Sequence, residues 1–132
     1  MFDSTPFGIT RTLDCPFQEG DARIRTALAA QGFGVLTEID LSATLKKKLD
    51  ATIRPYRILG ACHPQSAYAA LQAEPAIGLL LPCNVVVTED DAGHAVVSAI
   101  DPGAMFQVVQ ADGMDAVVED VRARLQAAID AA

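Results

Sequence analysis

Short stretches of alternating hydrophobic and polar residues recur along the chain, and this pattern predicts β-strands. In the first stretch, FGITRTLDC, the apolar side chains of Phe7, Ile9 and Leu13 share one face. The motif DDAG lies between the last two stretches and predicts a β-hairpin. The predicted strands cover residues 7–15, 33–40, 56–62, 83–89 and 94–101.

Four other stretches carry apolar residues at helical spacing. The first, 19–33, contains Ile24 and Leu28 and is expected to end at Gly32. The second, 41–50, has three leucines spaced four apart, with Ser42 as the expected cap and the leucine ridge expected to pack inward. The third, 64–74, begins at a proline and ends before another.

The fourth helix is predicted near the C-terminus, where Asp112 is placed to cap it. Its apolar stripe consists of Met114, Val117, Val118, Val121, Leu125 and Ala128. Between the third helix and the strand at 83–89, a continuous apolar run is interpreted as a buried connector reaching to about Leu81.

Together these elements predict an α+β fold in a single domain, 1–132, with a mostly antiparallel sheet of about five strands and helices packed on one face. The predicted core consists of Ile9, Ile24, Leu28, Val35, Ile58, Leu71, Val85, Val87, Val97, Val117, Val121 and Leu125.

Composition narrows the class of protein. The chain has 132 residues, of which 51% are hydrophobic and 20% charged, and this composition is typical of one globular domain. No apolar run is long enough to span a bilayer and the N-terminal stretch lacks a leader pattern, so we expect a soluble cytoplasmic protein without membrane contact. The net charge of −7 disfavours nucleic acid as a partner. We interpret the lysines at 46–48 as a solvated helix face.

The central third of the chain carries specific motifs. The segment YRILGACHPQSAYAALQAEPAIGLLLPCNVVV, followed by a hairpin and by IDP, resembles the bacterial and archaeal domain of unknown function 302 family. The resemblance extends from about Phe17 to the C-terminal helix. It implies a fold similar in shape to the TATA-box-binding protein and a homodimer, but no established activity. Members of the family commonly carry asparagine where this chain has His63.

The candidate chemistry centres on the three cysteines, whose odd number predicts no disulfide framework. Cys62 lies where a predicted strand meets a helix N-terminus, a setting that favours a thiolate, although a small buried residue explains the same position. Cys83 begins the next strand, and its neighbour Asn84 offers an amide. The helix and connector between the two cysteines are long enough to bring Cys83 back beside Cys62.

The remaining motifs are weaker. His63 is adjacent to Cys62 and is a candidate second ligand, whereas Cys15 and His94 are expected to lie elsewhere. No Ser-His-Asp grouping or phosphate-binding glycine loop is evident.

Two function classes stay open. The favoured one is a dimeric binding or accessory module with a small ligand or soft metal near Cys62 and Cys83. The alternative is a thiol redox enzyme with Cys62 as nucleophile. No cofactor is expected apart from that soft metal ion.

Overall fold

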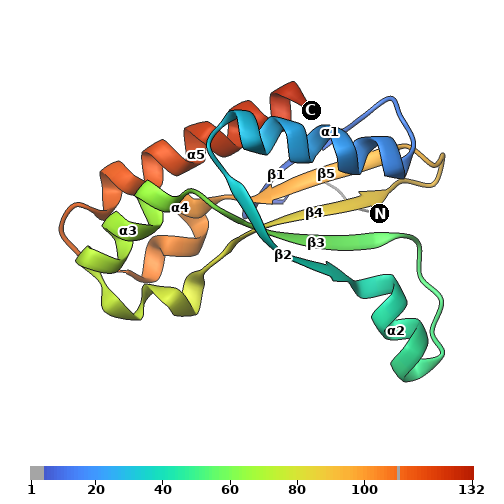
Figure 1. Ribbon diagram of the computed structural model, residues 1–132, viewed down its shortest axis with the longest axis horizontal. Coiled ribbons are helices and arrows are strands. Elements are labelled where there is room, and N and C mark those ends of the chain that lie inside the picture. Colours follow the sequence, from blue (N-terminus) through green and yellow to red (C-terminus); the bar gives the residue numbers. More distant parts are fainter. Residues whose placement is uncertain (1–4, 110) are drawn as a thin grey trace.

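A five-stranded antiparallel sheet forms the centre of the protein, as seen in a computed structural model that describes residues 5–109 and 111–132 (Figure 1). The strand order is β1-β5-β4-β3-β2, and every neighbouring pair is antiparallel. The strands are β1 (Gly8–Thr12), β2 (Gly34–Asp40), β3 (Tyr56–Cys62), β4 (Cys83–Glu89) and β5 (Ala95–Ile100). The predicted α+β class and strand number are confirmed.

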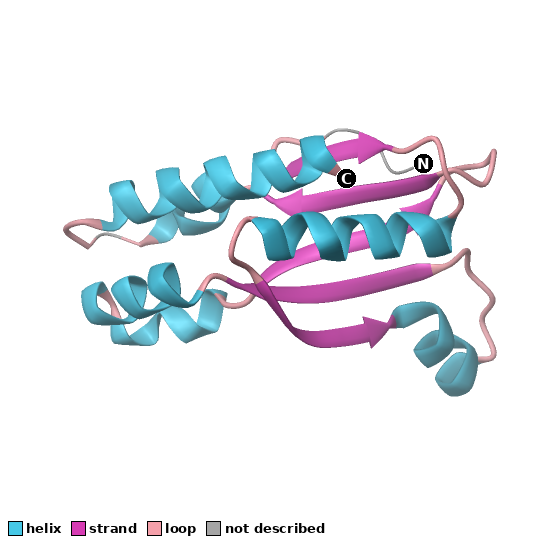
Figure 2. Cartoon of the chain, turned by 45° about the horizontal axis from the view of Figure 1, so that its top comes forward, coloured by secondary structure: helices cyan, strands magenta, loops and turns pink. Residues whose placement is uncertain are grey.

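Two long helices, α1 (Phe17–Ala30) and α5 (Met114–Ala131), lie side by side on one face of this sheet (Figures 1 and 2). The other helical segments gather at the ends of the sheet. They are α2 (Leu41–Leu49), α3 (Pro64–Ala73), the 3-10 helix η1 (Pro75–Leu80), α4 (Pro102–Met105) and the 3-10 helix η2 (Phe106–Val108). No helix within the described ranges is long and apolar enough to cross a membrane.

The main hydrophobic core lies between the sheet and the pair α1 and α5. Strand alternation directs Leu59 and Val85 into it, where both side chains are fully buried. They meet Ile24 of α1 and Leu125 of α5. Each such side chain contributes about 1.5–3 kcal/mol when fully buried, so this layer supplies much of the stability.

A second, smaller core cluster lies beyond the end of the sheet. It contains Ala70 of α3, Ile77 of η1, Phe106 and Met114 of α5. The predicted buried connector is therefore only partly correct, because it forms η1, in which Ile77 is buried while Leu79 is 87% exposed. The peptide bond between Leu81 and Pro82 is cis.

Helix α2 departs most from the sequence prediction. None of its residues is buried by the described part of the chain, so the leucine ridge does not pack inward. Its cap is Asp40, whose carboxylate accepts hydrogen bonds from the Ala43 N–H and from the hydroxyl of Ser42, the predicted cap. Donation by Ser42 and then by the Ala43 N–H lowers the pKa of Asp40.

Some predicted core residues are also wrong. Leu71 is 43% exposed because α3 lies beyond the sheet and buries only Ala70. Val35, Ile58 and Val117 are half-buried rather than buried. At the start of α5, Gly113 occupies the cap position that the sequence predicts for Asp112. The other predicted core residues are buried: Ile9, Ile24, Leu28, Val85, Val87, Val97, Val121 and Leu125.

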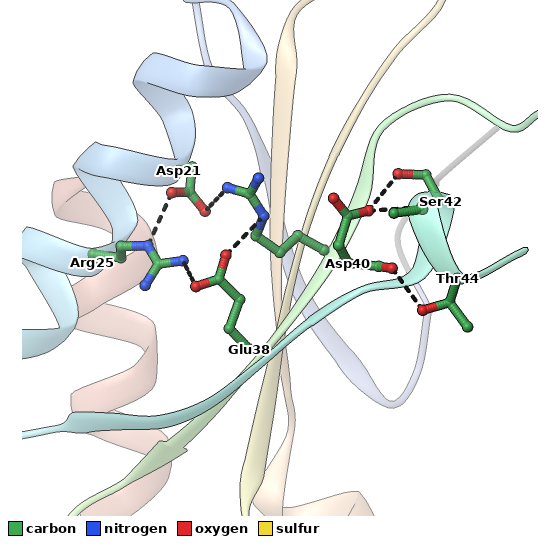
Figure 3. A network of polar contacts seen from close by, with 8 residues as sticks. Asp21, Arg25, Glu38, Asp40, Ser42 and Thr44 are labelled. Carbon is green, nitrogen blue, oxygen red and sulfur yellow. Dashed lines mark hydrogen bonds and ion pairs between the residues drawn. The ribbon is translucent and has the colours of Figure 1, made fainter. Parts of the chain in front are cut away.

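A ring of four charged side chains ties α1 to the sheet edge (Figure 3). Asp21 contacts Arg25 at 2.9 Å and Arg57 at 3.1 Å, and Glu38 contacts the same two arginines at 3.0 and 3.1 Å. The guanidinium of Arg57 also lies 5.1 Å from the ring centre of Phe17. Asp21 Oδ1 and Arg57 Nε have no well-aligned hydrogen-bond partner among the described residues, so their contacts are ion pairs only.

This ring predicts that Arg57→Ala lowers the free energy of unfolding by about 2 kcal/mol or more, because Asp21 would keep a mostly buried carboxylate with one cation fewer. Arg23→Ala is the control, since Arg23 pairs only with exposed carboxylates and its loss should change stability much less than the loss of Arg57. Urea unfolding followed by circular dichroism measures both. Equal losses for the two variants would show that the ring contributes no more than a surface pair.

Candidate functional site

An apolar cavity of about 250 Å³ lies at the junction of the two core clusters. Its walls come from β2, β3, α3, α5 and the segments around η1 and η2. None of the lining residues is an aspartate, glutamate, lysine or arginine. The lining residues are Phe33, Leu36, Thr37, Ala61, Cys62, His63, Ser66, Ala67, Ala70, Leu81, Pro82, Cys83, Phe106, Val117 and Val121.

Small residues keep this junction open. Ala61 of β3 and Ala67 and Ala70 of α3 contribute only methyl groups to the walls. At Gly60, an added Cβ would overlap the Thr37 hydroxyl and lie 2.8 Å from Pro82 Cγ, so glycine allows these two lining residues to approach β3. The exposed Leu36 and Thr37 place the opening of the cavity beside β2.

Thr37, His63 and Ser66 are the polar residues of the lining. His63 is the N-cap of α3, and its Nδ1 accepts the backbone N–H of Ser66 at 3.3 Å. The Ser66 hydroxyl lies 2.7 Å from the same nitrogen. His63 therefore performs the capping that an asparagine performs at this position. Its ring packs edge-on against Phe33, with 5.7 Å between the ring centres.

Cys62 and Cys83 both line the cavity as free thiols. Strand pairing sets Cys83 opposite Ala61, so Cys62 and Cys83 are one residue out of register on neighbouring strands. Because successive side chains alternate between faces, the two thiols leave their strands on opposite sides. Burial, and to a lesser extent the charge of a Cys62 thiolate, raises the pKa of Cys83 to about 11.

Three of the four predicted site residues therefore meet at one cavity: Cys62, His63 and Cys83. The fourth, Asn84, is exposed and does not line it. Cys15 is buried in the main core and His94 lies at the hairpin, so neither reaches the cavity. Sequence reasoning missed Ser66, although its position three residues after His63 at a proline-initiated helix indicates a capping pair.

Comparisons with known proteins point to one family. The sequence profile described as "Domain of unknown function DUF302" matches residues 9–132. A crystal structure of an uncharacterized conserved DUF302 protein from Bacillus stearothermophilus has a similar fold, with a TM-score of 0.87 and 26% sequence identity. The match covers 96% of this chain and 98% of that one. A comparison with curated proteins finds no match.

The raised pKa of Cys83 predicts slow alkylation of the folded protein. At pH 8 its thiolate fraction should be about 100-fold below that of an ordinary thiol, and the rate should rise with pH until about 11. The folded state also holds the thiol proton more tightly than the unfolded chain does. The contribution of Cys83 to the free energy of unfolding is therefore present below about pH 9 and is lost as the pH rises to about 11.

Iodoacetamide labelling at a series of pH values, with the modified cysteine identified by mass spectrometry, measures this rate. Protein unfolded in guanidinium chloride is the control, because Cys83 is then exposed. Labelling of folded Cys83 at pH 8 as fast as in the unfolded control would contradict the predicted burial.

Proposed function

We propose that this chain, which belongs to the DUF302 family, is a binding module that holds a small molecule in the cavity beside Cys62 and Cys83. The description of the family names no activity, so the proposal is based on the site itself. The single observation that carries this proposal is the cavity of about 250 Å³, bordered by core residues and lined almost wholly by apolar side chains. Sites for small ligands are typically concave and apolar, with a few placed polar groups.

The size of the cavity supports this proposal. An engineered apolar cavity of about 150 Å³ binds benzene, so about 250 Å³ accommodates a molecule of two fused rings.

The alternative function, a thiol redox enzyme with Cys62 as nucleophile, is less well supported. A disulfide cycle needs a second thiol, and Cys83 is the other cysteine of the cavity. With a pKa of about 11, Cys83 is protonated at neutral pH and is a poor attacking or leaving thiol.

A soft metal ion is a further occupant to test. Among residues 5–109 and 111–132, no group of three or more His, Cys, Asp or Glu side chains is arranged to hold a metal ion. A tetrahedral zinc site needs four ligands, and Cys62 and Cys83, which leave their strands on opposite sides, do not complete one by themselves. Protection of Cys62 and Cys83 from iodoacetamide by copper(I) would favour this occupant over an organic molecule.

We further propose a homodimer in which a second copy of the chain covers the sheet face opposite α1 and α5. Ile39 on that face is 47% exposed, and Leu49 of α2 is 71% exposed. The exposed lysines 46–48 of α2 contrast with the net charge of −7. In a dimer these lysines of α2 can pair with exposed carboxylates of the second copy.

The binding proposal predicts that indole binds with a Kd on the order of 0.1–1 mM, as expected for so small a ligand. The chain contains no tryptophan, so indole fluorescence reports binding directly. Ala67→Phe should abolish binding because Ala67 lines the cavity. Ala69→Phe is the matched control, since Ala69 is exposed on the same helix and does not line the cavity. Equal affinities for the two variants would place indole elsewhere and contradict the proposal.

The dimer proposal predicts a sedimenting mass near twice 13.9 kDa at micromolar concentration. Ile39→Lys should shift the protein towards the monomer by placing charge in the interface. Leu79→Lys is the control, because Leu79 is an exposed leucine of η1, which lies at the opposite end of the sheet from α2 (Figure 1). A wild-type mass near 13.9 kDa would reject the dimer, and equal dissociation of both variants would reject this face.

A further inference from the structure

The cavity also specifies the chemical class of its ligand. Resting on the proposed binding function, we infer that the ligand is an uncharged molecule of about two fused rings that donates one hydrogen bond to the hydroxyl oxygen of Ser66. Three features of the lining lead to this class: its charge, its volume and the direction of the hydrogen bond between Ser66 and His63.

The lining excludes ions. A charged group that leaves water needs a partner of opposite charge, and the cavity walls contain no carboxylate, lysine or arginine. The surroundings of Cys83 also disfavour charge, because burial there favours the neutral thiol over the thiolate. A carboxylate-bearing ligand would meet the same unfavourable surroundings.

The direction of the hydrogen bond between Ser66 and His63 depends on which ring nitrogen of His63 carries the proton. Nδ1 of His63 accepts the backbone N–H of Ser66, so this nitrogen carries no proton. The Ser66 hydroxyl, 2.7 Å from the same Nδ1, must therefore donate its hydrogen to it. Its oxygen keeps two lone pairs, and no other partner is found for it among the described residues.

Ser66 lines the cavity, and with its hydrogen donated to His63 the hydroxyl can act towards a ligand only as an acceptor. A ligand N–H or O–H satisfies it, whereas a ligand acceptor would face lone pairs and leave both groups unpaired. The exposed hydroxyl of Thr37 does not impose this selection, because it lies by the opening, where water reaches it.

Three probes of matched size test this inference. Indole carries an N–H donor, benzofuran replaces that N–H with an oxygen acceptor, and indole-3-carboxylate adds a negative charge. Indole affinity is measured by fluorescence and the other two by displacement of indole. We expect benzofuran to bind about 3- to 10-fold more weakly than indole and the carboxylate at least about 100-fold more weakly.

Two variants assign the donor preference to Ser66. Ser66→Ala should make indole and benzofuran bind equally, whereas Ser66→Thr should restore the preference because it keeps a hydroxyl. Thermal unfolding of both variants checks that α3 stays folded.

The outcomes separate the two proposals. Carboxylate binding as tight as that of indole would overturn the inferred ligand class, as would equal binding of benzofuran by the wild-type protein. In either case the binding function would stand. No binding of any probe would overturn the binding function itself, together with the class.

Discussion

Burial of one apolar stripe of α5 is the interaction on which the rest of the structure depends. The C-terminal part of the stripe, including Leu125 and Ile129, packs into the main core between the sheet and the helices. Its N-terminal residue Met114 belongs instead to the smaller cluster with Ile77 and Phe106. Helix α5 thus contributes buried residues to both hydrophobic clusters. The cavity lies between the two clusters, where Val117 and Val121 of α5 line it.

The cavity has an energetic cost that a ligand can recover. Closed cavities in cores lower the free energy of unfolding by about 24 cal/mol per Å³. A partly open cavity of 250 Å³ therefore lowers it by on the order of a few kcal/mol relative to a filled core. Larger side chains at Ala61, Ala67 or Ala70 would recover that energy by filling the space. The presence of alanine at all three positions fits a site that a bound molecule completes. The absence of charge from the lining then determines which molecules can do so.

Much of the fold could be predicted from the sequence because its signals are local. Alternation predicts strands such as β4, Pro64 marks the start of α3, and the DDAG turn identifies the hairpin. Helix α2 shows where such signals fail, since a leucine ridge does not reveal whether the folded chain offers a surface to pack against. The cavity was only partly predictable. Its cysteines follow from their place at strand ends, but the contribution of Phe106 and Val117 depends on how distant segments pack.

A crystal pressurised with xenon would show whether the cavity is preformed, because xenon enters such apolar cavities without needing polar contacts. We expect a xenon site between Ala61 of β3 and Ala70 of α3, with little movement of the surrounding side chains. A xenon-free junction filled by neighbouring side chains would contradict this expectation, because the two core clusters would then meet without leaving room for a ligand.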